Sequence, residues 1–379
     1  MSAPADTQPA SPSEPAAIVA FRHDACLAHD TGRGLFEDGP SPLIDIPEAH
    51  PESADLLRNL YSALDRGPLS GDIEWREAPC AGDDDLLTVH TREHIAAVDA
   101  LADADGVVRV IGQTWGSAAT PQAARRSAGA ALAAADVAAA GEAPVALAMT
   151  RPPGHHCAPE QIDGYCFYSN AALAAQRLRD LGAARVAIVD WDVHHGNGTE
   201  ACFWERGDVL TLSVHMDHRA WGHSHRQAGL ATDRGAGAGH GANLNVPLPF
   251  GCGDRAYAAA MREVVAPALA AFRPEAIVCA QGVDAGQFDP NGRMCVSMPG
   301  FHAIGEAVGE AARDLGIGSL AVTREGGYAR TYSALCHVAC LLGLLGRPLE
   351  LADPLAYLPD EGDAHGPYIA AARTAHGLA

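Results

Sequence analysis

The sequence predicts an α/β protein in which helices cover both faces of a mostly parallel sheet, and two observations support this prediction. Short runs rich in apolar and β-branched residues recur along the chain, and such unbroken runs are typical of strands buried on both faces. These runs cover residues 107–111, 145–150, 186–189, 209–214, 276–280 and 319–323. Helical patterns lie between several of them, at 118–140, 169–181, 255–272 and 300–315. The resulting alternation of strands and helices is that of a doubly wound fold.

Prolines support the start of two of these helices. Pro121 lies near the start of the helix at 118–140, and the helix at 300–315 opens after Pro299 and Gly300. Proline is tolerated in the first turn of a helix, because the amide groups there have no partner within the helix.

The chain of 379 residues is expected to form one large domain after a short tail. After residue 20 it contains no internal repeat and no change of composition typical of a linker. The first 18 residues have neither the basic start nor the apolar stretch of a signal peptide. We therefore predict a disordered tail over 1–18 and a single domain over 19–379.

The net charge limits the partners of the protein. There are 26 Lys and Arg against 47 Asp and Glu, a formal net charge of -21 at pH 7. This charge disfavours non-specific binding of nucleic acid and attracts cations, although an acidic surface more often serves solubility alone. No segment approaches 18 uninterrupted, strongly apolar residues. We expect neither a nucleic acid nor a membrane as a partner.

The cysteines indicate the compartment. Ten of them are scattered along the chain without a CxxC pair, and several, such as Cys279, lie inside apolar runs. This is typical of reduced, buried thiols. We expect a cytoplasmic protein.

Polar residues follow four of the predicted strands. The runs at 145–150 and 186–189 lead into "RPPGHHC" and "DWDVHHGNG". The runs at 276–280 and 319–323 lead into "QGVDAGQ" and "REGGYAR". In an open parallel sheet, ligands bind beyond the carboxyl ends of the strands, where these loops meet. The four motifs therefore predict one shared site.

Two of these motifs carry candidate metal ligands. Asp190, Asp192 and His194 occupy alternate positions and would point to one side of an extended chain, while Asp284 lies among small residues. Asp192, His194 and Asp284 would neutralise a divalent cation and leave one coordination position open, as a catalytic zinc requires. The same ligands would also accept Fe(II) or Mn(II). In the competing interpretation, Asp190 and Asp192 only cap the next helix and His194 is an ordinary loop residue.

The other two motifs carry candidate proton carriers and a hydrogen-bond donor. His155 and His156 follow a rigid Pro-Pro-Gly turn, and a histidine that binds no metal can deprotonate water and protonate a leaving amine. Asp190 and Asn197 could orient the two rings. Tyr328, after two glycines, could donate a hydrogen bond to the oxygen that becomes negative when water attacks a carbonyl.

Two further patterns have a weaker link to function. Cys157 is a candidate thiol nucleophile beside the histidine pair, but a cysteine enzyme does not need the second, metal-like cluster. The segment 215–225, "HMDHRAWGHSH", could bind a second ion or line a channel, but an exposed histidine-rich loop is the simpler interpretation.

Taken in order, five motifs resemble those of the histone deacetylase and acetylpolyamine amidohydrolase family, above all its class II and bacterial members. They are "RPPGHH", "GYCFYSNAALAA", "DWDVHHGNGT", "QGVDAG" and "EGGY", with "HPES" and "LLTVHTREHI" also fitting. The similarity extends from about His23 to Leu358. It implies the three-layer α/β fold of arginases and deacetylases and the zinc-dependent hydrolysis of an acyl-amine bond.

The resemblance also implies roles for the candidate residues. Asp192, His194 and Asp284 would hold one zinc ion per chain. His156 would be the main acid-base residue with His155 as its electrostatic partner.

Further roles concern the substrate and a second ion. Tyr328 would polarise the acyl carbonyl, and Gly164 and Tyr165 would form the channel wall, where the family usually has Gly-Phe. Asn197 stands where class I members have aspartate and matches class II. A structural potassium ion would be bound around a set of backbone and side-chain oxygens, those of Asp190, Asp192, His194, Ser213 and Val214.

Several alternatives stay open at this level. The substrate could be acetyl-lysine in a protein, an acetylpolyamine or another small N-acyl amine, and the hydroxyl of Tyr165 makes the acyl preference uncertain. Many relatives associate, so a homo-oligomer is a further expectation. A binuclear manganese hydrolase of the arginase type would need more carboxylates near "DWDVHH". A non-catalytic acyl-lysine binder would have no need of His156 and Tyr328.

Overall fold

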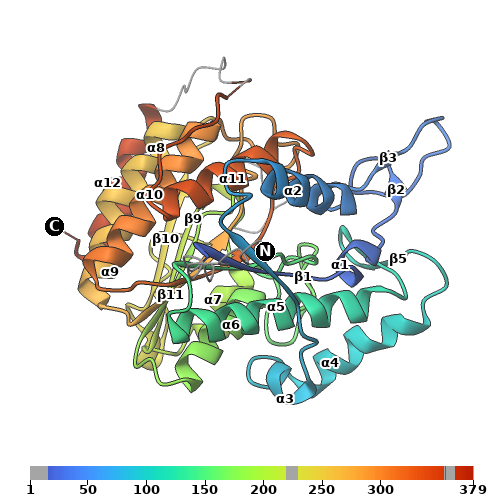
Figure 1. Cartoon of the computed structure of the whole chain (residues 1–379), viewed down its shortest axis with the longest axis horizontal. Coiled ribbons are helices and arrows are strands. Elements are labelled where there is room, and N and C mark those ends of the chain that lie inside the picture. Colours follow the sequence, from blue (N-terminus) through green and yellow to red (C-terminus); the bar gives the residue numbers. More distant parts are fainter. Residues whose placement is uncertain (1–15, 219–228, 354, 356–362, 379) are drawn as a thin grey trace, which may run out of the picture.

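The centre of the protein is an eight-stranded parallel sheet, seen in a computed structural model that describes residues 16–218, 229–353, 355 and 363–378 (Figure 1). All pairings in this sheet are parallel, and the strand order is β10-β9-β8-β11-β12-β7-β1-β4. The strands are β1 Ile18–Arg22, β4 Ile73–Glu77, β7 Val145–Ala148, β8 Val186–Asp190, β9 Val209–Met216, β10 Asn243–Leu248, β11 Ala276–Gln281 and β12 Leu320–Arg324.

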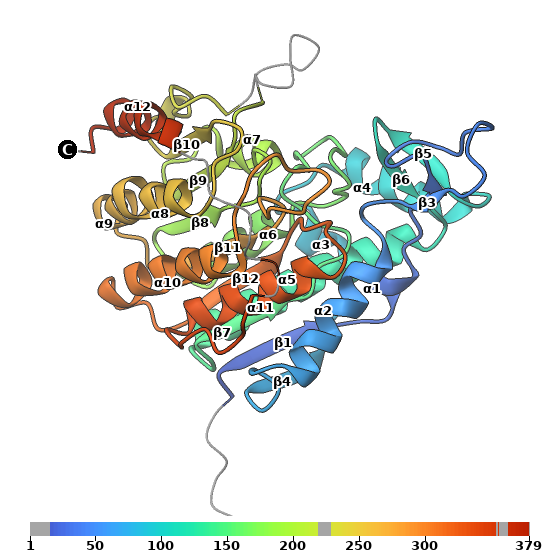
Figure 2. The same cartoon turned by 90° about the horizontal axis from the view of Figure 1, so that it is seen from above.

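Helices cover both faces of the sheet, because successive strand residues point into two separate apolar cores. On β1, Ile18 and Ala20 pack in the core beneath α2, α8, α10 and α11, whereas Val19 and Phe21 pack beneath α5 and α6 (Figures 1 and 2). The predicted α/β fold with three layers is confirmed. The helices are α1 Ala25–Ala28, α2 Ala54–Arg66, α3 Asp83–Leu86, α4 Arg92–Asp99, α5 Thr120–Ala140, α6 Asn170–Asp180, α7 Asn197–Phe203, α8 Asp254–Ala260, α9 Ala266–Phe272, α10 Met298–Asp314, α11 Tyr332–Leu344 and α12 Gly366–His376.

The predicted helix at 255–272 is interrupted by a wider turn. A π-helical segment, Met261–Val265, joins α8 to α9. Pro267, the second residue of α9, lacks the amide hydrogen that a regular α-helix would use to bond the carbonyl four residues back. The helix is continuous in direction but not in its hydrogen-bond pattern. Within the described ranges, no helix is both long and apolar enough to cross a membrane.

The prediction for residues 107–111 is wrong about the partner of this strand and about its burial. Residues 107–111 do not join the main sheet: β5 Val108–Ile111 pairs antiparallel with β6 Thr114–Gly116 in a separate hairpin. Gly112 has φ +50°, which suits a tight turn directly after β5. The strand alternates between half-buried and exposed residues, with Arg109 on the exposed side. Such alternation is typical of a strand with one face in solvent.

Three strands of the main sheet were not predicted from the sequence. β4 is an edge strand with alternating charged residues, and β10 is an edge strand that contains Pro247. β1 begins at Ile18, which the predicted tail over 1–18 includes. Ile18 is fully buried, so the tail prediction extends too far at this residue, while residues 1–15 lie outside the described part.

The strand order explains why the four sequence motifs meet. β8, β11, β12 and β7 are consecutive neighbours in the sheet, and each precedes one of the motifs. Because all four strands run in the same direction, the loops after them leave the same edge of the sheet.

Candidate active site

The loops after these four strands surround one small pocket. Its cavity of about 150 Å³ lies between His156, His194 and Tyr328 and is closed on one side by Gly164 and Tyr165. The predicted channel residues therefore do line the pocket. The remaining lining residues, none of which was predicted, are Glu37, Gln113, Thr114, Asp163 and Asn291.

The three candidate ligands meet at the base of this pocket. The Nδ1 atom of His194 lies 3.2 Å from Oδ1 of Asp192 and 3.1 Å from Oδ2 of Asp284. Backbone amides hold the carboxylates in place: Gly326 donates to Asp192 at 2.8 Å, and Val193 donates to Asp284 at 2.8 Å. The loops after β8, β11 and β12 are thereby connected through the ligands themselves.

The electrostatics of this group fit a divalent cation. Asp192 and Asp284 are fully buried, and burial together with the charge of Asp192 raises the pKa of Asp284 to about 7. Burial disfavours the charged form of His194, but its hydrogen bonds to the two carboxylates raise its pKa well above the usual value. A proton on His194 thus supplies the positive charge that the carboxylates require, and a metal ion would supply it in its place. A Cβ on Gly326 would come within 2.6 Å of a carboxylate oxygen of Asp192, so only glycine leaves room here.

The competing interpretation of these aspartates as helix caps is wrong. Helix α7 begins after Gly196, and no side chain caps its first turn. Asp190 instead accepts a hydrogen bond from the Nδ1 atom of His155 at 3.0 Å. Burial opposes the charged form of His155, but Asp192 and Asp190 outweigh it and raise the pKa of His155 to about 10. His155 is therefore an imidazolium at neutral pH.

His156 has the opposite character. Its Nδ1 atom lies 2.6 Å from Oδ1 of Asn197, and the amide nitrogen of Asn197 donates to Asp163 at 3.2 Å. Since an amide oxygen only accepts hydrogen bonds, Nδ1 of His156 carries the proton and Nε2 is left unprotonated. Burial and the charges of His155 and His194 lower the pKa of His156 well below its usual value. His156 is thus neutral and can accept a proton, whereas His155 already carries one.

Tyr328 forms part of the pocket wall as a neutral phenol. Its ring packs edge-on against Tyr165 at 5.7 Å, and burial, with the charges of Asp284 and Asp192, raises its pKa well above the usual value. A phenol that keeps its proton can donate a hydrogen bond to an oxygen in the pocket. The backbone amide of Tyr328 donates to Asp289 at 2.6 Å, a contact that fixes this loop. Asp289 was not predicted, although "FDPNG" is a recognisable turn signal.

Glycines set the spacing of the catalytic loops. Gly164 has φ +49°, and a Cβ at this position would overlap the ring of His156. A Cβ on Gly198 would overlap the backbone between His156 and Cys157. The glycines of "HHGNG" therefore let this loop lie directly against "GHHC".

The hydroxyl of Tyr165 connects two loops at the pocket mouth. It donates to the carboxylate of Glu37 and accepts a hydrogen bond from the amide nitrogen of Asn291 at 3.0 Å. A phenylalanine, the usual family residue, could make neither bond. The mouth of this pocket is consequently polar and acidic.

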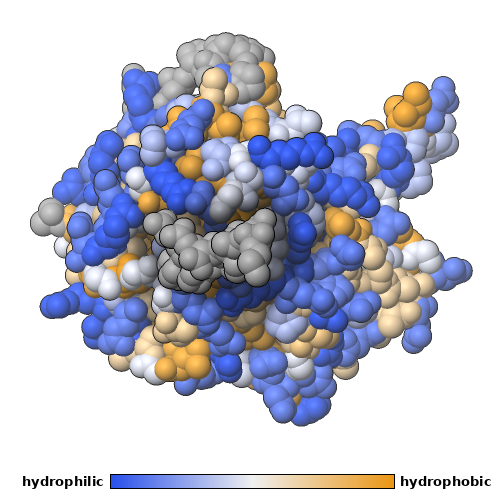
Figure 3. Space-filling view, viewed as in Figure 1, coloured by the Kyte–Doolittle hydropathy of each residue, from blue (hydrophilic) through white to orange (hydrophobic). Residues whose placement is uncertain are grey.

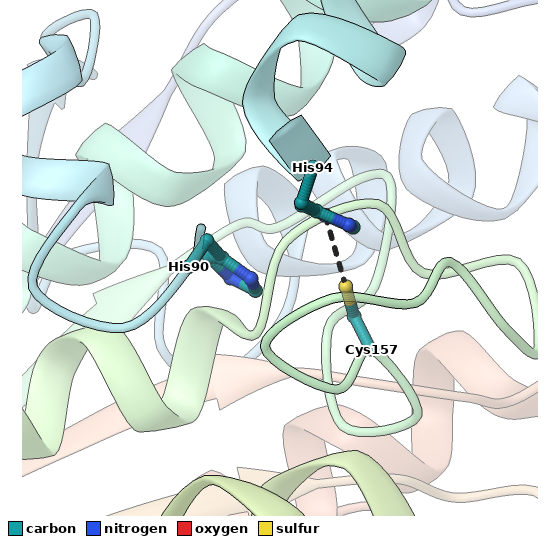
Figure 4. Close-up of side chains that lie close together, drawn as sticks. All are labelled: His90, His94 and Cys157. Atoms are coloured by element: carbon teal, nitrogen blue, oxygen red, sulfur yellow. Dashed lines mark hydrogen bonds between the residues drawn. The ribbon is translucent and has the colours of Figure 1, made fainter. Parts of the chain in front are cut away.

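Cys157 belongs to a second histidine cluster outside the pocket (Figure 4). Its sulfur is fully buried, lies 3.5 Å from Nε2 of His94, and has a pKa raised well above the usual value by burial. A protonated, inaccessible thiol cannot act as the nucleophile, so that alternative is wrong.

The two histidines of this cluster anchor the catalytic loop. The Nδ1 atom of His90 lies 3.3 Å from the carbonyl oxygen of Pro159, and its Nε2 atom accepts a hydrogen bond from the backbone amide of Ser169 at 2.9 Å. His94 donates to the carbonyl of Phe167 at 2.7 Å. Both nitrogens of His90 are therefore occupied by backbone partners, which accounts for the cluster without a metal ion.

The histidine-rich segment 215–225 is only partly described, since His223 and His225 lie outside the described residues. His215 is fully buried at the end of β9, where its Nε2 atom lies 3.0 Å from the carbonyl of Gly229. This residue belongs to the core, so the interpretation of an exposed loop does not hold for it.

The fold and the site define the protein as a hydrolase of the amidohydrolase type. Residues 50–344 match the family model of the histone deacetylase domain. The chain is 42% identical over 347 residues to histone deacetylase 8 of Arabidopsis thaliana, covering 91% of this chain and 92% of that protein. It is 41% identical over 339 residues to the histone deacetylase-like amidohydrolase of Pseudomonas aeruginosa, covering 88% of each. The crystal structure of the HDA15 HD domain superimposes with a TM-score of 0.79 at 28% identity, covering 94% of this chain and 95% of that one. The chain belongs to the histone deacetylase family.

Proposed function

We propose that the protein is a zinc-dependent deacetylase that hydrolyses the acyl amide of acetyl-lysine or acetylpolyamine substrates. The observation that carries this proposal is the meeting of Asp192, His194 and Asp284 with the unprotonated Nε2 atom of His156 and the phenol of Tyr328 at one pocket. Metal ligands, a base and an oxyanion donor are the groups that amide hydrolysis by water requires.

Each group then has a distinct task. A zinc ion held by the three ligands would polarise the acyl carbonyl and make water more acidic. His156 accepts a proton from the attacking water at Nε2 and returns it to the departing amine. Tyr328 donates a hydrogen bond to the carbonyl oxygen as negative charge develops there. His155 stays protonated between Asp190 and Asp192 and offsets the negative charge around the site.

The substrate class is tested by comparing turnover of acetyl-lysine peptides with that of acetylated polyamines. Among the described residues, Glu37 and Asp163 line the pocket and no Lys or Arg does, which supports an acyl amine that carries a further positive charge. Hydrolysis of either class supports the proposed function. If the zinc-loaded protein hydrolyses neither these substrates nor other small N-acyl amines, the proposed function is wrong.

Tyr328→Phe is expected to lower kcat by about 100-fold or more, because the substitution removes one preorganised hydrogen bond to the developing oxyanion. Steady-state kinetics on an acetyl-lysine peptide measure this loss. Tyr332→Phe serves as the matched control, since the Tyr332 hydroxyl contacts Asp353 and the Met298 amide and does not line the pocket. An unchanged kcat for Tyr328→Phe would remove the phenol from the mechanism.

Glu37→Gln is expected to raise the KM for a cationic substrate by about fivefold, the effect of a partly exposed charge pair. Glutamine keeps an oxygen that can accept the Tyr165 hydrogen bond, so mainly the charge changes. N-acetylputrescine and the neutral N-butylacetamide, which have four-carbon chains, form the test pair. Glu310→Gln, on the exposed surface of α10, is the control. Equal changes for both substrates would show that Glu37 does not recognise charge.

A structural potassium ion forms part of the proposal. Asp190 and Ser213 are opposite each other in the register of β8 and β9, and Val214 follows. Their oxygens, with those of Asp192 and His194, would hold the ion. All ten cysteines lie in the described residues and none of them forms a disulfide bond, which supports a location in the reducing cytoplasm.

A further inference from the structure

Asp163 differs from the acidic residues at the surface of the protein. Hydrophilic residues spread over the face shown in Figure 3, as expected for a chain with 47 Asp and Glu. Asp163 is instead half-buried and lines the catalytic pocket. Its carboxylate accepts hydrogen bonds from two amides, the backbone amide of Gly164 and the side-chain amide of Asn197. A charge in this position acts on the neighbouring groups of the site more strongly than a charge in water would.

A tight turn fixes the direction of this carboxylate. Asp163 and Cys166 form two backbone hydrogen bonds, of 3.3 and 2.7 Å, around Gly164 and Tyr165. Both central residues have a positive φ, +49° and +68°, as a type I′ turn requires. The backbone amide of Gly164 donates to Oδ1 of Asp163 at 2.9 Å. The turn therefore leaves Oδ2 of the same carboxylate to contact a group outside the turn.

The side-chain amide of Asn197 contacts both Asp163 and the base of the site. Its nitrogen Nδ2 donates to Oδ2 of Asp163 at 3.2 Å, and its oxygen Oδ1 lies 2.6 Å from Nδ1 of His156. A carboxylate accepts hydrogen bonds and cannot donate them. If the amide were turned by half a rotation, two oxygen atoms would face each other at Asp163, and an N–H group would face Nδ1 of His156. The carboxylate thus selects the orientation in which the amide oxygen faces the histidine.

We propose that Asp163 is a positioning residue that sets the tautomer of His156 through the amide of Asn197. With the amide oxygen facing the ring, Nδ1 keeps its proton and Nε2 is left as the base. Because the hydrogen bond from Asn197 ends on a charged group, it is stronger than a bond between neutral groups, and it polarises the amide. The polarised oxygen also stabilises the positive charge that His156 acquires when it takes a proton from water. This inference rests on the proposed function, in which His156 is the base.

Asp163→Asn is expected to lower kcat by about 10²-fold or more, because it reverses the amide and moves the proton. Asparagine has one side-chain oxygen for two donors, and the bond to Gly164 is the shorter one and lies within the turn. The new amide nitrogen then faces Asn197, whose own amide must turn and present an N–H to His156. The proton of His156 moves to Nε2, and the base is lost. Steady-state kinetics on a neutral acetyl-lysine peptide measure the loss without a contribution from charge recognition.

Exchanging the two side chains should restore the activity. When Asp163→Asn is combined with Asn197→Asp, the new carboxylate accepts the Nδ1 proton of His156 and an N–H of the new amide. The oxygen of that amide still accepts from Gly164, so every donor has an acceptor and kcat should return to within about threefold of the wild type. If the combined variant is as impaired as Asp163→Asn, the inference is wrong.

Asp180→Asn is the matched control for removing a carboxylate that accepts from an amide. Asp180 ends α6, accepts a hydrogen bond from the side-chain nitrogen of Gln176 at 2.7 Å, and does not line the pocket. This variant should keep the kcat of the wild type. A loss equal to that of Asp163→Asn would show that the effect does not depend on the position of the carboxylate.

The position of the proton can also be observed without a substrate. Nitrogen NMR of zinc-loaded protein with labelled histidines distinguishes a protonated ring nitrogen from an unprotonated one, and the signals missing from His156→Ala identify this ring. We expect the proton on Nδ1 in the wild type and on Nε2 in Asp163→Asn. A wild-type proton on Nε2, or a proton that stays on Nδ1 in Asp163→Asn, overturns the inference. Because this measurement needs no turnover, its failure is distinguishable from a failure of the proposed function.

Discussion

Asp284→Ala is expected to yield a folded protein that retains almost no divalent metal and has no measurable amide hydrolysis. Asp284 supplies one of three ligands, and its loss leaves one carboxylate and one imidazole, too few to hold the ion against water. Elemental analysis of protein prepared without chelator measures the metal directly. The same measurement on the wild type identifies the metal as zinc, iron or manganese.

The matched control for this variant is Asp208→Ala. Asp208 pairs with Arg206 and Arg179 near the surface and does not line the pocket. This control should keep both the metal and the activity. Because the ion pairs that Asp208→Ala removes are partly exposed, the free energy of unfolding should change only slightly. One full equivalent of metal in Asp284→Ala would contradict the ligand assignment.

The meeting of the three candidate metal ligands was predictable from the sequence, because it depends on strand order in a simple way. Asp192, His194 and Asp284 directly follow buried strands, and parallel strands deliver such residues to one edge. The partner assignments of His155 and His156 were predictable as well, since Asp190 and Asn197 flank the loop that carries Asp192 and His194.

Other parts of the site had no such signal. Glu37 and Asp163 reach the pocket from irregular loops, and no periodicity places a loop residue in space. The hairpin at β5 and β6 was misplaced because its short apolar run is the same length as a buried strand. Edge strands β4 and β10 were missed because polar residues and a proline interrupt the pattern on which the prediction relied.

His156→Ala is expected to lower kcat by about 10²- to 10⁴-fold, the usual contribution of a positioned acid-base group. The reason is specific to this ring: Asn197 fixes the proton on Nδ1, so Nε2 is the free base at the pocket. His155→Ala should lower kcat by less, because His155 has a pKa of about 10 and already carries its proton at neutral pH. Single-turnover kinetics with bound substrate separate this chemical step from binding.

The metal content distinguishes loss of the base from loss of the ligand set. His156 does not contact Asp192 or Asp284 by any hydrogen bond in the described residues, so His156→Ala should retain a full equivalent of metal, unlike Asp284→Ala. His302→Ala, on α10 with its ring 2.7 Å from the carbonyl of Arg347, is the control for removing an imidazole elsewhere. If His156→Ala keeps its metal and its kcat falls by less than a few-fold, the proton of the attacking water must pass to another group. Equal losses for His155→Ala and His156→Ala would instead mean that the two rings act as a single unit, and the assignment of one base by its tautomer would be wrong.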